Sequence, residues 1–301
     1  MTISRNLKPV LLKKTVLFII NPISGGKSKS HVPELIAQNL DLVQFEYTYR
    51  FTEGVGHARE LAKEAVQKGI DIVIAVGGDG TINEIASVLS GTDKILGIIP
   101  MGSGNGLGTS LAIPFDVAKA IGVLNRMQVM TIDSATLNGH PFFNVSGIGF
   151  DAEISARFAR DKSRGLWGYV RNTIAEIIHY RPKWYKLTID GIVYHRQAFM
   201  ISLANSTQYG NNAHIAPEAS LTDGLLDFCV IKPFELYLFP ILAYRLFSKT
   251  AHRSKFIEIF KAREIKVERD EPGPVHLDGE PVQMGTELLI SLKPATLKVI
   301  H

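Results

Sequence analysis

The N-terminal part of the chain alternates short apolar runs of β type with polar loops and helix-type segments. The apolar runs are Thr15–Ile20, Gln44–Tyr49, Ile70–Val76 and Ile95–Ile99. Strands that alternate with helices predict a parallel, doubly wound sheet. Ligands of such a sheet bind beyond the carboxyl ends of its strands. The sequence therefore predicts an α/β domain with a binding site at one edge of the sheet.

Three loops rich in glycine, serine or asparagine follow strands at this edge: Asn21–Lys27, Gly77–Thr81 and Gly102–Gly108. A glycine turn between a strand and a helix lets backbone N–H groups approach phosphate oxygens. A single loop of this kind is explained equally well as a tight turn with Asp79 or Thr81 as N-cap. Three such loops at one edge favour a phosphate site, although none has Walker A or dinucleotide-fingerprint spacing. The pattern Thr81-x-x-Glu84 predicts that the following helix begins at Thr81.

After about Thr131 the chain changes to short β-type runs separated by turn signals such as Asn138-Gly139 and Asp190-Gly191. This pattern predicts an antiparallel β-sandwich. Two helix-type segments interrupt it, near Ala152–Tyr180 and near Glu235–Phe260. We expect residues 1–131 to form the α/β nucleotide-binding domain and residues 132–294 the sandwich domain with inserted helices. Residues 295–301 are expected to return to the first domain.

Composition narrows the class of protein. The 301 residues carry a formal net charge of +4, a mild basic excess that suits polyphosphate ligands or an anionic membrane surface. We expect no nucleic-acid partner, because no basic stripe with interleaved aromatics is evident. The lone Cys229 excludes an internal disulfide and favours the cytoplasm. The apolar run Leu236–Tyr244 is too short to span a bilayer, so we expect any membrane contact to be peripheral.

Several motifs, in order along almost the whole chain, resemble the diacylglycerol kinase catalytic family, which includes bacterial soluble lipid kinases and sphingosine kinases. They are Asn21-Pro-x-Ser24-Gly25, Gly77-Gly-Asp-Gly-Thr81, Pro100-x-Gly-Ser103-Gly-Asn105, Asn205 with Tyr209-Gly210, Pro217-x-Ala219, Asp223-Gly224-x-Leu226-Asp227 and Asp278-Gly279-Glu280. The resemblance implies an α/β nucleotide domain packed against a β-sandwich domain, with the active site between them.

The resemblance also implies an ATP site built from the loops of the first domain. The residues that it assigns to ATP are Asn21, Pro22, Ile23, Ser24, Gly25, Thr52, Gly77, Gly78, Asp79, Gly80, Thr81, Ile82, Asn83 and Ser103. Asp79 would act on Mg²⁺ through water, because Mg²⁺ keeps much of its hydration. Thr52 alone reads equally well as a turn or cap residue before Gly54.

The Asp278-Gly279-Glu280 motif carries the expected chemistry. A hydroxyl nucleophile needs a carboxylate within hydrogen-bond reach to accept its proton. The resemblance assigns this role to Glu280, with Asp278 supporting it or contacting the metal. Asp-Gly between two strands is also a hairpin signal, and a turn that presents a carboxylate satisfies both interpretations.

A second metal site is implied at Ser220–Leu225. By resemblance to the bacterial members, the Asp223 carboxylate and the backbone carbonyls of Ser220 and Leu225 would hold Mg²⁺. Hard oxygen ligands suit this ion. An ordinary Asp-Gly turn is the alternative.

We therefore expect an ATP-dependent lipid kinase that transfers the γ-phosphoryl group of ATP to a lipid hydroxyl, most simply that of diacylglycerol, giving a phosphatidic-acid-type product. The form Asn105-Gly106-Leu107 of the third loop is closer to the sphingosine kinases, so a sphingoid-base kinase is an alternative. An enzyme like NAD kinase shares the central glycine motif. A non-catalytic nucleotide- or lipid-binding regulator is the alternative from another class.

The expected partners are a lipid substrate and, transiently, a membrane surface. Two stretches that combine basic and aromatic residues, Arg157–Arg171 and Phe234–Phe260, are candidates for that contact. A solvated helix face and core packing are their alternative interpretations. The oligomeric state stays open, a homodimer included.

Overall fold

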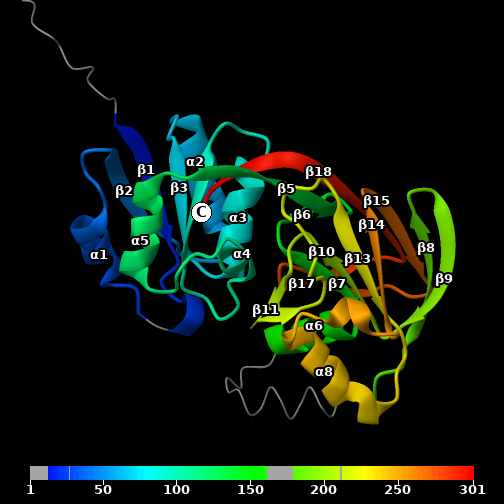
Figure 1. Cartoon of the computed structure of the whole chain (residues 1–301). Coiled ribbons are helices and arrows are strands. Elements are labelled where there is room, and N and C mark those ends of the chain that lie inside the picture. The colour runs from blue at the N-terminus through cyan, green and yellow to red at the C-terminus, as the bar shows by residue number, and fades with distance from the viewer. Residues whose placement is uncertain (1–12, 27, 161–178, 211) are drawn as a thin grey trace, which may run out of the picture.

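The computed structural model describes residues 13–26, 28–160, 179–210 and 212–301. It contains an N-terminal α/β domain and a C-terminal β-sandwich domain (Figure 1). This is the predicted fold class. The expected basic stretch Arg157–Arg171 lies mostly outside the described residues, as does Lys27 of the first loop.

The N-terminal sheet is built from four parallel strands in the order β2-β1-β3-β4. Their bounds are β1 (Lys14–Ile20), β2 (Phe45–Phe51), β3 (Ile72–Gly77) and β4 (Ile95–Pro100). The central strand β3 is buried along its whole length, as expected of a strand covered on both faces.

Helices cover both faces of this sheet. α1 (Val32–Asn39) packs with α5 (Val117–Arg126), and α2 (His57–Gln67) packs with α3 (Asp79–Leu89). The short α4 (Gly106–Ser110) follows the third glycine loop. Helices α4 and α5, which lie between β4 and Thr131, were not predicted.

The sandwich packs two antiparallel layers around an apolar core. One layer has the order β14-β13-β10-β7-β16-β17. The bounds are β7 (Val145–Gly149), β10 (Met200–Ala204), β13 (Leu226–Ile231), β14 (Ile257–Ala262), β16 (Gly273–Leu277) and β17 (Glu280–Met284). The facing layer contains β5 (Val129–Leu137), β6 (His140–Phe142), β8 (Lys183–Ile189), β9 (Ile192–Ala198), β15 (Glu264–Arg269) and β18 (Glu287–Ile300). A small hairpin, β11 (Gln208–Gly210) and β12 (Ala213–His214), stands apart.

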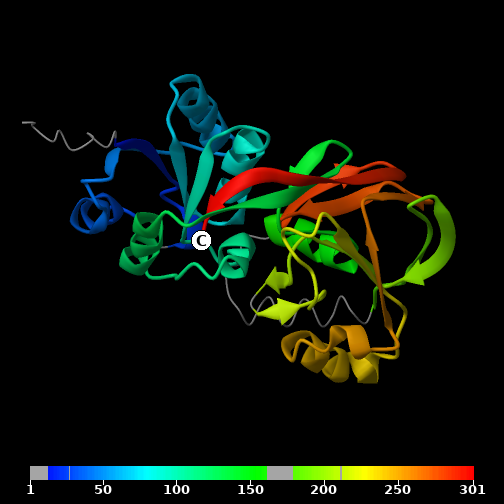
Figure 2. The same ribbon diagram turned by 45° about the horizontal axis from the view of Figure 1, so that its top comes forward.

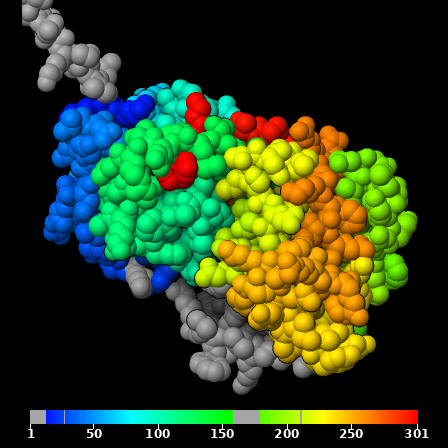
Figure 3. Space-filling model, in the orientation of Figure 1, coloured from blue at the N-terminus to red at the C-terminus, as the bar shows by residue number. Residues whose placement is uncertain are grey.

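Two long strands join the domains into one sheet. Strand β18 pairs with β15 in the sandwich and then runs parallel to β4, and β5 accompanies it as an antiparallel neighbour along most of this length. Figures 1 and 2 show both strands crossing from one domain to the other. In the space-filling view the C-terminal atoms, coloured red, are visible over the first domain and beside the second (Figure 3).

The helical predictions for the second domain hold only in part. Helix α6 spans Phe150–Arg160, so it begins two residues before the expected segment and overlaps its first part. The segment Glu235–Phe260 is not one helix: it contains two 3₁₀ turns, η2 (Leu236–Leu238) and η3 (Ala251–Arg253), around α8 (Phe239–Phe247), and then enters β14. Lys249, with φ 58°, lies outside the helical region of backbone conformation, so the helix cannot continue past it.

Candidate active site

A cleft of about 450 Å³ lies between the two domains, and both contribute its walls. The predicted site residues that line it are Asn21, Pro22, Ile23, Thr52, Gly80, Thr81, Asn83 and Glu280. The remaining members of the predicted ATP and catalytic set, Ser24, Gly25, Gly77, Gly78, Asp79, Ile82, Ser103 and Asp278, are not part of the wall. Glu53, Val55, Arg59, Glu84 and Val282 line the cleft without having been predicted.

The first and second loops are tied together inside this cleft. The side-chain amide of Asn21 donates to Thr81 Oγ1 at 3.0 Å, and Asn21 Oδ1 accepts from the backbone N–H of Ile23 at 3.1 Å. Asn21 belongs to the first loop and Thr81 to the second, so this hydrogen bond links the two loops. Helix α3 begins at Asp79 with Gly78 as N-cap, so the predicted start at Thr81 was wrong.

Glu84 has a different role from the predicted capping box. Its two carboxylate oxygens accept the backbone N–H groups of Gly56 and Arg59, at 2.8 and 3.2 Å. These N–H groups belong to the start of α2, where the free donors of a helix end favour an acceptor of negative charge. Glu84 thus holds the loop after β2 against α3, at the wall of the cleft.

The glycines of the three loops permit close backbone contact. A Cβ on Gly25, which has φ +59°, would lie 2.5 Å from the Met101 carbonyl oxygen. A Cβ on Gly102 would collide with the Cα of Gly78. The three loops therefore meet at the carboxyl end of the sheet, and side chains at these positions would push them apart.

Asp79, a residue of the second loop, binds the backbone of the third loop through its carboxylate. Its two oxygens accept the backbone N–H groups of Asn105 and Gly106, both at 2.7 Å. Burial, aided by the nearby charge of Asp278, raises the pKa of Asp79 to about 6, although the two backbone hydrogen bonds act in the opposite direction. The carboxylate thus bridges the second and third loops.

The turn between β16 and β17 is a two-residue hairpin in which Asp278 (φ 48°) and Gly279 (φ 89°) both adopt positive φ. Asp278 itself is a buried anchor. Its carboxylate accepts four hydrogen bonds, from the Asn83 side-chain amide and from the backbone N–H groups of Phe143, Asn144 and Val145. Burial raises the pKa of Asp278, and these bonds oppose that shift.

Glu280 is the first residue of β17 and projects toward α3. A Cβ built on Gly80 would lie 2.9 Å from Glu280 Oε1. The carboxylate is thus in contact with the start of α3, where the second glycine loop enters the helix. Glycine at position 80 leaves room for it.

A buried polar chain behind this turn was missed from the sequence. His276 Nδ1 accepts the backbone N–H of Gly279 at 3.3 Å, and His276 Nε2 lies 2.9 Å from Asp151 Oδ2. The hydroxyl of Tyr209 also donates to Asp151. His276 and Asp151 are 125 residues apart, so no local sequence pattern predicts their contact. These hydrogen-bonded side chains support the turn that carries Glu280.

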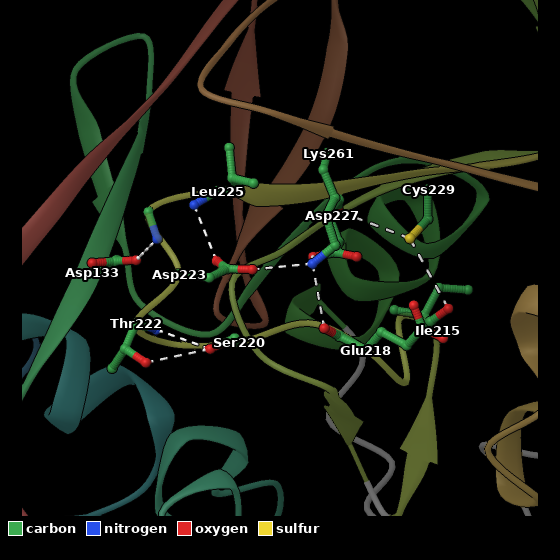
Figure 4. Close-up of polar contacts among 11 residues, drawn as sticks. Asp133, Ile215, Glu218, Ser220, Thr222, Asp223, Leu225, Asp227, Cys229 and Lys261 are labelled. Carbon is green, nitrogen blue, oxygen red and sulfur yellow. Dashed lines mark hydrogen bonds and ion pairs between the residues drawn. The ribbon is translucent and has the colours of Figure 1, made fainter.

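The predicted metal residues Ser220, Asp223 and Leu225 lie in the turn just before β13, where the structure places a lysine beside Asp223 (Figure 4). Lys261 Nζ is 3.1 Å from Asp223 Oδ2 and 3.3 Å from Asp227 Oδ2. Asp223 Oδ1 accepts the backbone N–H of Leu225 at 3.1 Å.

The carboxylate of Asp223, which the expected ion would need as a ligand, is already paired with a cation, the Lys261 ammonium. Burial lowers the pKa of Lys261, but its contacts with Asp223 and Asp227 outweigh this effect and raise it. Among the described residues, no group of three or more His, Cys, Asp or Glu side chains is arranged to hold a metal ion. The role of Ser220, Asp223 and Leu225 in binding Mg²⁺ stays a prediction, and an ion there would compete with Lys261 for the Asp223 carboxylate.

Comparison with known proteins agrees with this architecture. Residues 15–137 match the diacylglycerol kinase catalytic domain, and residues 144–301 match the YegS C-terminal NAD kinase beta sandwich-like domain. A diacylglycerol kinase of Bacillus subtilis is 30% identical, over 89% of this chain and 90% of the relative. A protein of Pectobacterium atrosepticum named "Probable lipid kinase YegS-like" is 31% identical, over 88% and 89%.

A solved structure of a diacylglycerol kinase from Bacillus anthracis superimposes with a TM-score of 0.78, at 28% identity, and the match covers 96% of this chain and 97% of that chain. The chain belongs to the diacylglycerol kinase catalytic family. It is a lipid kinase of the group that combines this catalytic domain with the YegS-type sandwich.

Proposed function

We propose that this lipid kinase transfers the γ-phosphoryl group of ATP to the free hydroxyl of diacylglycerol, giving a phosphatidic-acid-type product. The observation that carries the proposal is the contact between Glu280 and Gly80, which puts a carboxylate of the second domain against a nucleotide-type loop of the first. Phosphoryl transfer depends mainly on positioning and on electrostatic stabilisation, and a cleft with these two walls supplies both.

The three converging loops form the nucleotide side. We assign ATP to Asn21–Gly25, Thr52, Gly77–Asn83 and Ser103. Gly80 and Thr81 at the start of α3 line the cleft, and the N–H groups of a helix start favour phosphate oxygens. Asn21 holds the first loop in register with the second. Thr52 is buried directly after β2 and lines the same cavity.

Glu280 is the proposed general base. Its carboxylate accepts the proton of the lipid hydroxyl as the hydroxyl oxygen bonds to the γ-phosphorus, and the bond from that phosphorus to the β–γ bridging oxygen breaks, so that ADP leaves. Asp278 acts through the turn: it fixes the backbone that presents Glu280 and contacts Asn83. Mg²⁺, when bound with the nucleotide, neutralises phosphate charge, and Asp79 is the carboxylate that we assign to it through water.

The direct test is thin-layer chromatography of labelled ATP products with diacylglycerol, sphingosine and NAD as acceptors. We expect labelled phosphatidic acid with the wild-type protein, and a loss of about 10²–10⁴-fold in kcat for Glu280→Gln with ATP binding retained. Glu271→Gln, an exposed carboxylate change shortly before the same hairpin, is the matched control.

Three results would contradict the proposal in separable ways. A labelled product with sphingosine alone would show that the acceptor is a sphingoid base and not diacylglycerol. A labelled product with NAD alone would show that the substrate is not a lipid. Full activity of Glu280→Gln would contradict the role of Glu280 as base but not the lipid kinase activity.

A further inference from the structure

Helix α8 and the segment that follows it present apolar side chains to solvent. Five large apolar residues between 236 and 247 have exposed fractions from 46% to 76%: Leu236, Tyr237, Ile241, Tyr244 and Phe247. Tyr237, Ile241 and Tyr244 follow each other at spacings of four and three residues and therefore share one face of the helical segment. A contiguous exposed apolar face of this kind marks an interaction surface.

The opposite side of α8 is anchored in the protein. Leu242 is buried and packs into an apolar cluster with Phe150, Phe199 and Cys229. Tyr209 packs against the same cluster, and its hydroxyl donates to Asp151 of the chain that braces the catalytic turn. The exposed face is thus packed onto the second domain from behind, and Figures 1 and 2 show α8 along the lower side of that domain, whereas β8 and β9 form the end farthest from the first domain.

The same segment has a one-sided charge. Residues 236–257 contain no Asp or Glu but include Arg245, Lys249, Arg253 and Lys255. None of these four cations forms an ion pair with another residue that the structure describes. Aromatic and aliphatic side chains with basic neighbours are the composition of helices that lie in the interface of an anionic bilayer.

We propose that the face formed by residues 236–255, called here the α8 face, docks this enzyme on an anionic lipid bilayer, with Tyr237, Ile241 and Tyr244 entering the headgroup region. The inference rests on the proposed function, since a diacylglycerol acceptor resides in a bilayer. No described helix is long and apolar enough to cross a membrane, so the contact is one of surface insertion. The basic residues select the anionic lipid by charge complementarity.

The test is flotation of the full-length protein with vesicles of phosphatidylcholine, with and without phosphatidylglycerol. Ile241→Asp with Tyr244→Asp should lower vesicle binding at least tenfold. Arg253→Glu with Lys255→Glu should remove the preference for phosphatidylglycerol and its sensitivity to salt. Ile192→Asp, which alters an equally exposed apolar residue on β9, should bind like the wild type.

Binding of all variants at the wild-type level would overturn the proposal. So would a result in which Ile241→Asp with Tyr244→Asp converts a dimer to a monomer in sedimentation while vesicle binding persists, because the face would then contact a second copy. Activity in detergent micelles separates this test from that of the reaction. Vesicle binding without lipid phosphorylation would contradict the reaction alone, and phosphorylation in micelles without vesicle binding through the face would contradict the docking alone.

Discussion

The carboxylate of Asp278 accepts a hydrogen bond of 2.8 Å from the side-chain amide of Asn83, a residue 195 positions earlier in the chain. Asn83 lies in α3 of the nucleotide domain, and Asp278 lies in the hairpin that carries Glu280. The bond therefore ties the two walls of the cleft together.

Asp278→Asn should destabilise the protein. An amide side chain has one oxygen where the carboxylate has two, so at least one of the backbone N–H donors of residues 143–145 would lose its acceptor. We expect a loss of about 2–4 kcal/mol, the range of one or two buried groups left unsatisfied. Denaturant unfolding measures it. Asp270→Asn, at an exposed carboxylate of the neighbouring loop, should leave the midpoint unchanged, and equal effects of the two changes would contradict the anchoring role.

Gly80→Ala should reduce turnover without reducing stability. Alanine is favourable within a helix, but its methyl group would lie 2.9 Å from Glu280 Oε1 and displace the carboxylate. We expect kcat to fall about 10–100-fold, in line with the sensitivity of catalysis to misplacement of about 1 Å. Gly122→Ala is the matched control, because Gly122 is also helical and a Cβ there meets no atom within 4 Å. Unchanged kcat for Gly80→Ala would argue against Glu280 as the base.

Lys261→Met should destabilise the protein, more at neutral than at acidic pH. Without the ammonium, Asp223 and Asp227 would repel each other, and burial already raises the pKa of Asp227. Lowering the pH would protonate Asp227 and relieve the repulsion. We expect a loss of about 1–3 kcal/mol at pH 7, the scale for a buried charge that loses its partner.

The same variant tests the second metal site. With Lys261 removed, added Mg²⁺ should raise the melting temperature of the variant, while Lys266→Met, which breaks an exposed ion pair, should show no Mg²⁺ effect. A wild-type melting temperature that rises with Mg²⁺ through Asp223 would show that the ion displaces the ammonium.

Asp79 should make stability depend on pH between about 4 and 6. Its pKa is raised from 3.8 to about 6, so the folded state binds the proton more tightly than the unfolded state. The contribution of this group is therefore present at low pH and is lost as the pH rises to about 6. The unfolding free energy of the wild type, relative to Asp79→Asn, should fall by at most about 3 kcal/mol over this window. A difference that grows with pH would contradict the assignment.

The parts of the fold that local pattern determines were predictable. The β-type runs and the Asn-Gly and Asp-Gly turns lie where expected, because Asn138 and Asp190 adopt the positive φ that such hairpins require. The interruption after α8 was not predicted, since an apolar stretch of this length fits a helix and a strand almost equally.

Contacts between distant residues explain what was missed at the site. Glu84 fits a capping box in sequence, yet its carboxylate reaches α2, 28 residues earlier. Lys261 meets Asp223 only because β14 pairs with β13. Neither the hydrophobic period nor the turn residues of a sequence identify such partners. These contacts are seen only once the helices and strands are packed in the folded structure.

The position of β18 has a consequence for the order in which the molecule is made. Its residues Lys298 and Val299 pair with β4, so the edge of the N-terminal sheet stays unpaired until about 200 further residues have left the ribosome after β4. Domains generally fold from the N-terminus during synthesis, and an open parallel edge is a site of aggregation. A nascent chain of this enzyme is therefore expected to need protection at β4 until β18 has emerged.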